Sequence, residues 1–170
     1  MKMQLDTARP VFLLVDDNSD DQALARMALS QAGIDVELRI VSDGEAALAY
    51  LRREGEFADP EVSPRPTLML LDLRMRAVDG YEVLEEVRRD PQLCDQPIVV
   101  FTTSDAPSDI ARCYKLGCNS YVVKPTQLAP LVATVRDLIH YWCNLVQLPD
   151  VGRFRQIASL ASCDGLDSCE

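Results

Sequence analysis

The sequence predicts an α/β protein built on a doubly wound parallel sheet. Short, continuous apolar runs alternate along the chain with segments in which apolar residues recur at helical spacing. Continuous apolar runs are typical of parallel strands that helices cover on both faces. Such alternation, with right-handed crossovers, favours a five-stranded, flavodoxin-like sheet of strand order 2-1-3-4-5, flanked by five helices.

The first strand is predicted at 11–15, a run of five apolar residues. Ser19 is the expected N-cap of the helix that follows, because a hydroxyl accepts hydrogen bonds from first-turn amides. Acidic residues in that first turn, Asp20 and Asp21, also favour a helix start. Apolar residues continue at helical spacing as far as Gly33, a typical C-terminal stop.

The second strand and helix follow directly. Residues 36–41 alternate apolar and polar side chains, which is typical of an edge strand with one face partly exposed to solvent. The turn at 42–44 opens a helix that carries Tyr50 and Leu51 on its apolar side. Residues 53–66 are charged and contain three prolines, so they form a loop longer than the usual ~4–6 residues.

The same patterns predict the remaining elements. Asp79-Gly80 opens the third helix and Gly117 stops the fourth. The predicted elements are a strand at 67–71, a helix at 79–90, a strand at 97–101, a helix at 107–116, a strand at 120–123 and a helix at about 128–146.

Composition and charge fit one cytoplasmic domain. The 170 residues are 48% hydrophobic, which is enough for a single core. A net charge of -10 argues against binding to nucleic acid or to an anionic membrane surface. No stretch reaches the ~20 apolar residues that span a bilayer, and residues 1–9 do not resemble a secretory signal. We expect one domain at 1–148 and a tail at 149–170, either disordered or packed on the domain or on a partner.

Five polar residues directly follow apolar runs: Asp16, Asp17, Asp72, Thr102 and Lys124. Open α/β sheets bind ligands at the carboxyl ends of their strands, so these side chains are expected to meet there. Unit charges ~4 Å apart repel by ~4 kcal/mol at an effective dielectric of ~20, so three carboxylates need a compensating cation. Mg²⁺ prefers carboxylate and phosphate oxygens, and the set therefore suits a site for Mg²⁺ and a phosphoryl group.

Each of these residues also has an ordinary structural explanation. The acid pair can cap a helix, Asp72 can belong to a turn, Thr102 can simply end a strand, and Lys124 can lie in a solvated loop. Only their joint placement at the strand ends favours a shared site.

Four parts of the sequence resemble the receiver domain of two-component response regulators. They are Asp16-Asp17-Asn18, Leu71-Asp72-Leu73 with Asp79-Gly80, Phe101-Thr102-Thr103-Ser104 and Tyr121-Val122-Val123-Lys124-Pro125. The resemblance covers about residues 11–146. It implies a stand-alone phosphorelay protein, rather than an enzyme, that takes a phosphoryl group from a sensor histidine kinase onto Asp72 in a Mg²⁺-dependent reaction and then changes conformation.

The resemblance also implies the metal ligands. Asp17 and Asp72 would bind Mg²⁺ directly, Asp16 would bind it through water, and the backbone carbonyl of Arg74 would complete the set. Two positions depart from the family pattern. Arg74 stands where asparagine is common, and Arg76 stands where proline is usual, so this loop is expected to be more mobile.

Four more residues would handle the phosphoryl group and the switch. Lys124 would pair with the phosphoryl group, and the backbone amide of Thr103 would contact it. Thr102 would be the switch hydroxyl and Tyr121 the switch aromatic. An aromatic residue on a short edge strand is also a common packing residue, so that alternative stays open for Tyr121.

The sequence further resembles single-domain regulators that pair with bacterial phytochrome histidine kinases. The similarity lies in residues 41–51, the long proline-bearing loop, Thr102-Thr103-Ser104 and Tyr141-Trp142. It implies a red-light-sensing kinase as phosphodonor and a homodimer formed through the last helix. The apolar side of that helix extends to Trp142 and exceeds what one sheet can cover.

Two alternatives from other classes remain. A Mg²⁺-dependent phosphatase or phosphotransferase with an aspartyl nucleophile would need a substrate cap and an acid–base aspartate two residues after the nucleophile, where this chain has Arg74. A dimeric scaffold that never takes phosphate would leave three carboxylates repelling one another without use.

Overall fold

The computed structural model describes residues 9–149, which contain one five-stranded parallel sheet. Its strands are β1 (Val11–Val15), β2 (Glu37–Val41), β3 (Leu68–Leu71), β4 (Ile98–Thr102) and β5 (Ser120–Val123). They lie in the order β2-β1-β3-β4-β5, and each neighbouring pair is parallel. The predicted doubly wound sheet and its strand order are confirmed.

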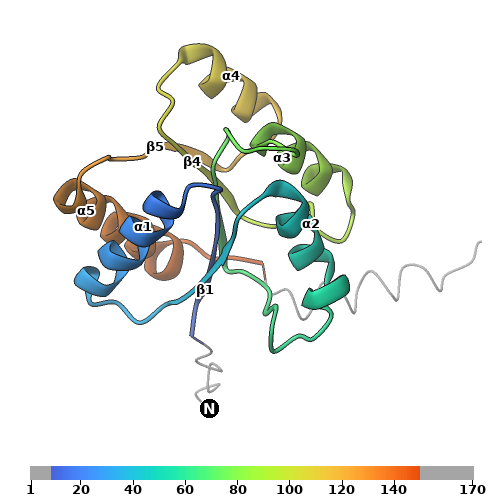
Figure 1. Cartoon of the computed structure of the whole chain (residues 1–170), viewed down its shortest axis with the longest axis horizontal. Coiled ribbons are helices and arrows are strands. Elements are labelled where there is room, and N and C mark those ends of the chain that lie inside the picture. The colour runs from blue at the N-terminus through green and yellow to red at the C-terminus, as the bar shows by residue number, and fades with distance from the viewer. Residues whose placement is uncertain (1–8, 150–170) are drawn as a thin grey trace, which may run out of the picture.

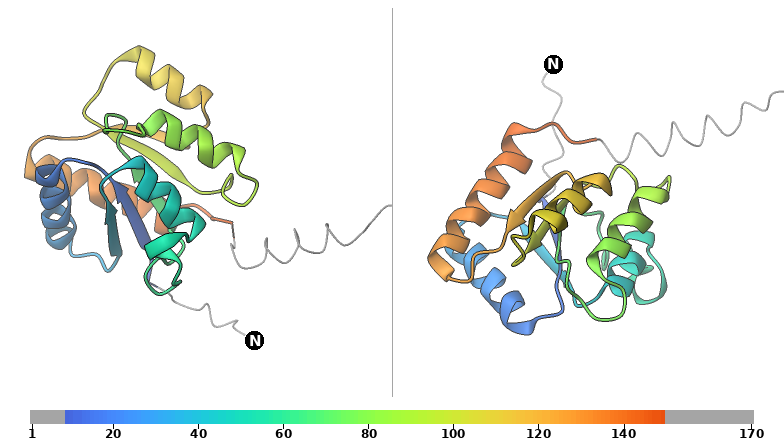
Figure 2. Two further views of the ribbon diagram at one scale, coloured as in Figure 1. Left: turned by 45° about the vertical axis from the view of Figure 1, so that its right-hand side comes forward. Right: turned by 90° about the horizontal axis from the view of Figure 1, so that it is seen from above.

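Helices cover both faces of this sheet. Within the described residues the α-helices are α1 (Ser19–Ala32), α2 (Gly44–Arg52), α3 (Gly80–Arg89), α4 (Pro107–Lys115) and α5 (Leu128–Ile139). α1 and α5 pack on one face, and α2, α3 and α4 pack on the other (Figures 1 and 2). None of them is long and apolar enough to cross a membrane.

The two-sided packing explains the continuous apolar strands. Every residue of β1 is buried. Leu13 and Val15 face the α2–α4 side, whereas Phe12 and Leu14 face the α1–α5 side. Most of β2 is only partly buried, as expected for an edge strand. The long loop before β3 contains a 3-10 turn, η1 (Gly55–Phe57).

The start of α1 differs from the prediction. Asn18 is the N-cap, and its side-chain oxygen accepts hydrogen bonds from the N–H groups of Asp20 (2.9 Å) and Asp21 (3.3 Å). Ser19, the predicted cap, is the first helical residue. Both residue types cap helices well, and the choice is made by Asp16, whose Oδ1 accepts from the Asn18 N–H at 2.9 Å.

The last helix also differs from the single helix predicted to about residue 146. α5 ends at Ile139, and the chain continues as a π-helical segment, η2 (His140–Leu145). The apolar side is retained, since Leu138, Ile139 and Trp142 are all buried. The predicted tail lies, apart from its first residue, outside the described residues.

Candidate functional site

Backbone hydrogen bonds extend the sheet into the candidate site. The N–H of Asp16 donates to the last carbonyl of β2 at 3.1 Å, and the N–H of Asp72 donates to the last carbonyl of β1 at 3.0 Å. The N–H of Lys124 donates to the carbonyl of Thr102 at 2.7 Å. These bonds fix the backbone of each polar residue just beyond its strand, so the side chains start from defined positions at one edge.

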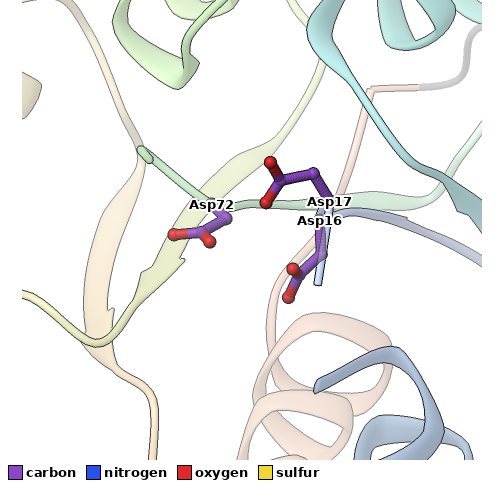
Figure 3. A group of neighbouring side chains, drawn as sticks. All are labelled: Asp16, Asp17 and Asp72. Atoms are coloured by element: carbon purple, nitrogen blue, oxygen red, sulfur yellow. The ribbon is translucent and has the colours of Figure 1, made fainter. Parts of the chain in front are cut away.

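Three carboxylates converge at this edge (Figure 3). One oxygen each from Asp16, Asp17 and Asp72 lies within 4.8 Å of the others. Asp16 is fully buried and Asp72 nearly so, while Asp17 is half-buried. Burial raises the pKa of Asp16, although the hydrogen bond from Lys124 acts in the opposite direction. The spacing is compatible with one metal ion shared by oxygen ligands.

Lys124 places a buried ammonium beside these acids. Its Nζ lies 2.7 Å from Asp16 Oδ2, 3.0 Å from Asp21 Oδ2 and 3.8 Å from Asp72 Oδ2. Burial by itself lowers the pKa of Lys124, but the hydrogen bond to Asp16 and the nearby carboxylates outweigh it, so the pKa lies above its ordinary value. No sequence pattern places Asp21 in the site, because an acid in a first helical turn is common.

The two oxygens of Asp72 have different surroundings. Oδ1 accepts a hydrogen bond from the N–H of Leu73 at 2.7 Å. Oδ2 lies beyond hydrogen-bond distance of the Lys124 ammonium. Among the described residues, Oδ1 is therefore the hydrogen-bonded oxygen of this carboxylate, and Oδ2 has only the more distant ammonium beside it.

The hydroxyl of Thr102 is buried at the end of β4. Among the described residues it has no hydrogen-bond partner. A buried polar group without a partner costs ~1–3 kcal/mol, so the site is incomplete without an acceptor for this hydroxyl. A phosphoryl oxygen has that chemistry. This orphaned hydroxyl, together with the carboxylate cluster and the ammonium, fits a site for a metal ion and a phosphoryl group.

The loop after Asp72 is exposed. The side chain of Arg74 is 76% exposed and reaches within 3.9 Å of Asp109. Arg76 is 96% exposed, and its N–H donates to Asp17 Oδ2 at 3.3 Å. Thr103 is also exposed. The roles expected for the Arg74 carbonyl and the Thr103 amide remain predictions.

Tyr121 connects β5 to the loop after β4. Its hydroxyl donates to the Ser104 carbonyl at 2.9 Å, and its ring packs partly on the α2–α4 side of the core. The Ser104 hydroxyl donates to Asp109 Oδ2 at 2.6 Å. Hydrogen bonds from Ser104 and from Tyr81 lower the pKa of Asp109. Tyr121 is thus both a packing residue and a polar contact, and the Ser104–Asp109 pair, which no sequence pattern suggested, holds the start of α4.

The sequence matches the response regulator receiver domain over residues 12–136. Among curated proteins it is similar to the response regulator Rcp1 of Synechocystis sp., with 42% identity over 139 residues that cover 82% of this chain and 92% of Rcp1.

Solved structures give the same result. The phosphorylated cyanobacterial phytochrome response regulator RcpA has a TM-score of 0.77 and 39% identity, covering 84% of this chain and all of that one. The Mn²⁺-bound form of Rcp1 has a TM-score of 0.72 and 41% identity, covering 82% of this chain and 99% of that one. The bacteriophytochrome response regulator RtBRR has a TM-score of 0.67 and 35% identity, covering 95% of this chain and all of that one.

Proposed function

The chain belongs to the response regulator receiver domain family of two-component signalling, and we propose that Asp72 is its phosphoacceptor. One observation carries this assignment. Asp72 is a buried carboxylate at a strand end, its Oδ2 is free to react, and it lies among two further carboxylates and a buried ammonium. Receiver domains partner with sensor histidine kinases, which identifies the chemical class of the phosphodonor.

The transfer follows from these positions. Asp72 Oδ2 attacks the phosphorus of a phosphohistidine on the kinase, a new P–O bond forms, and the P–N bond breaks with its electron pair moving to the imidazole nitrogen. Lys124 offsets the negative charge on the transferring oxygens. The hydroxyl of Thr102 gains a phosphoryl oxygen as acceptor, and the backbone amide of Thr103 donates to another.

Mg²⁺ is the proposed cofactor. Oxygens of Asp17 and Asp72 and the carbonyl of Arg74 would hold it directly, and Asp16 would hold it through water. When bound, the cation neutralises charge on the carboxylates and on the phosphoryl oxygens. The three clustered carboxylates support this proposal, and the Mn²⁺-bound form of Rcp1 supports a divalent cation in a similar protein.

Phosphorylation would act as a conformational switch. A phosphoryl group on Asp72 would satisfy the buried hydroxyl of Thr102 and draw it inward. The loop after β4 would move with it, and Tyr121 would exchange its bond to the Ser104 carbonyl for other packing. This shifts an existing two-state equilibrium at β4, α4 and β5.

The similar proteins support a more specific proposal for the kinase partner. Both RcpA and RtBRR carry phytochrome response regulator names, and this similarity supports a bacterial phytochrome kinase as donor. A homodimer through the last helix and a cytoplasmic location, without nucleic-acid or membrane partners, complete the proposal.

The chain would act as a phosphoacceptor and not as an enzyme on a separate substrate. An aspartyl-nucleophile phosphatase is disfavoured because Arg74 occupies the position of its acid–base aspartate.

The test uses the full chain with Mg²⁺ and acetyl phosphate, followed by intact-protein mass spectrometry. Wild type is expected to gain the mass of one phosphoryl group, and Asp72→Asn is expected to gain none. Asp137→Asn, which changes an exposed acid on α5, serves as the matched control and should label like wild type. Equal labelling of Asp72→Asn and wild type, or no labelling of wild type, would overturn the assignment.

A further inference from the structure

A fourth carboxylate shares the ammonium of Lys124. Asp21, in the first turn of α1, accepts a hydrogen bond from Lys124 Nζ at 3.0 Å. Asp16 accepts another at 2.7 Å, and Asp72 lies further away at 3.8 Å. The lysine that should serve the phosphoryl group is therefore hydrogen-bonded to two other acids and not to the phosphoacceptor.

Local structure places Asp21 in this position. The Asn18 cap accepts hydrogen bonds from the N–H groups of Asp20 and Asp21, which fixes the first turn of α1. Asp16 Oδ1 accepts a hydrogen bond from the N–H of Asn18 in turn, so both acids bonded to Lys124 belong to one hydrogen-bonded junction between β1 and α1. Asp20, the neighbouring acid, is exposed and Asp21 is half-buried. The position of Asp21 is therefore specific and not a general property of an acidic helix start.

Asp21 also differs electrostatically from the other acids around Lys124. Asp16, Asp17 and Asp72 have oxygens close enough to share a metal ion, and Asp21 is outside that cluster. A bound divalent cation would compensate the clustered acids, whereas Lys124 is the cation that Asp21 contacts directly. When a phosphoryl group draws Lys124 toward itself, Asp21 loses this compensation and its charge opposes the new anion.

We propose that Asp21 is a positioning residue that holds Lys124 in the unphosphorylated state and competes with the phosphoryl group for it. The proposal rests on the function assigned above and deepens it, because it identifies what limits the affinity of the site for phosphoryl. Asp21→Asn keeps an acceptor oxygen for Lys124 but removes the charge. This variant is expected to bind a phosphoryl analogue more tightly than wild type.

The experiment is calorimetric titration of fluoroberyllate into the full chain at saturating Mg²⁺. We expect the affinity of Asp21→Asn to rise by about fivefold or more, the lower end of typical couplings between sites. Asp20→Asn removes the same charge from the same turn and should match wild type. Asp21→Glu restores the charge and should return most of the affinity toward the wild-type value.

Thermal unfolding of each variant checks that the fold is intact. If Asp21→Asn does not fold, Asp21→Ser replaces it, and its affinity for fluoroberyllate is expected to change in the same direction. An affinity of Asp21→Asn equal to that of Asp20→Asn, or weaker than wild type, overturns the role of Asp21 alone. A wild-type protein that takes no fluoroberyllate overturns the assigned function and this inference with it.

Discussion

Gly80 controls the backbone of the proposed phosphoacceptor. A β-carbon on this residue would collide with the carbonyl oxygen of Asp72 and would lie 2.7 Å from the Cα of Leu73. The N–H of Gly80 donates to the Leu73 carbonyl at 3.0 Å, so the first turn of α3 is held directly against the end of β3. Because the obstructing atoms are backbone, rotation of a side chain cannot relieve the contact.

Gly80→Ala is therefore expected to destabilise the fold and the site together. Overpacking of this kind costs ~1–3 kcal/mol, and the displaced backbone carries Asp72, so affinity for Mg²⁺ and fluoroberyllate should fall as well. Urea unfolding and calorimetry measure the two effects. Gly33→Ala is the control. Its φ of +69° implies about 1–2 kcal/mol of strain, but a β-carbon there meets nothing within 4 Å. This variant should therefore lose stability and keep its affinity for both ligands. Wild-type affinity in Gly80→Ala would contradict this account.

The site residues differ in how far the sequence could predict them. Asp16, Asp17, Asp72, Thr102 and Lys124 were predictable because each follows an apolar run, and the sheet then brings them to one edge. Asp21 was not, because its pattern is that of any acid near a helix start. Its contact with Lys124 spans 103 residues of sequence and depends on the direction of a long side chain, which no local pattern encodes.

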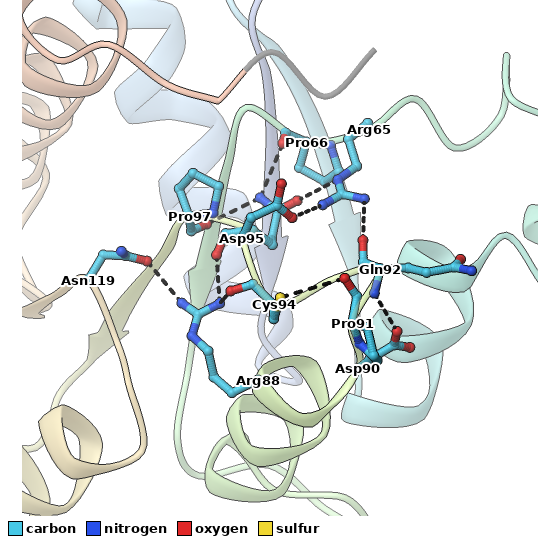
Figure 4. Close-up of polar contacts among 11 residues, drawn as sticks. Arg65, Pro66, Arg88, Asp90, Pro91, Gln92, Cys94, Asp95, Pro97 and Asn119 are labelled. Carbon is cyan, nitrogen blue, oxygen red and sulfur yellow. Dashed lines mark hydrogen bonds and ion pairs between the residues drawn. The ribbon is translucent and has the colours of Figure 1, made fainter. Parts of the chain in front are cut away.

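At the scale of elements, Arg88 near the end of α3 forms hydrogen bonds with the segments that precede β4 and β5, at the amino-terminal side of the sheet. Its Nε donates to the Gly117 carbonyl at 2.8 Å, and its Nη1 donates to the carbonyls of Cys94 (3.0 Å) and Gln96 (2.9 Å). Its Nη2 donates to Asn119 Oδ1 at 3.0 Å (Figure 4). One guanidinium thus links α3 to the loop before β4 and to the turn before β5.

Arg88→Met should lower the free energy of unfolding by at least ~2 kcal/mol, because four acceptors, two of them in partly buried hydrogen bonds, lose a charged donor at once. The neighbouring Arg89→Met is the matched control. Arg89 is 69% exposed and pairs with Glu85 at 3.6 Å, so its loss should change stability by no more than ~0.5 kcal/mol. Urea unfolding of both variants compares the two positions, and similar losses in both would show that the Arg88 contacts contribute little.

The bounds of helices and strands are predictable from sequence patterns only where no specific contact decides them. β1 and β5 agree with prediction because apolar runs and flanking polar residues define them. Capping preference predicts Ser19 as the N-cap of α1, but it cannot rank adjacent Asn and Ser, and the deciding contact comes from Asp16. The π-helical end of the last helix was not predictable, because buried spacing over a few residues does not report which hydrogen bonds form.

At the scale of the whole molecule, Lys124 connects the two sides of the candidate site. β1 and β5 are separated by β3 and β4 in the sheet, yet Lys124 after β5 is hydrogen-bonded to Asp16 after β1. Its long side chain crosses the carboxyl ends of the two strands between them. A displacement at the end of β5 would therefore also change the contacts at the start of α1, on the other side of Asp72.

The end of the last helix is the surface proposed for the homodimer. Tyr141 and Leu145 are 50% and 61% exposed, whereas Trp142 is only 8% exposed and packs in the α1–α5 core. The sequence predicts a homodimer through the last helix, with an apolar side that extends to Trp142. The structure assigns Trp142 to the core of its own chain, so replacing it would report on folding more than on association.

Replacing Tyr141 and Leu145 with serine tests the dimer without disturbing that core. If this face forms the interface, removing two exposed apolar side chains near its centre should weaken self-association by ~2 kcal/mol, or roughly thirtyfold, while thermal stability of the fold changes little. Sedimentation velocity over a range of concentrations measures the association. Met27→Ser removes a 50% exposed apolar side chain from α1 and is the control that should leave it unchanged. Unaltered sedimentation in the double variant, or equal weakening in Met27→Ser, would place the contact between copies elsewhere on the surface.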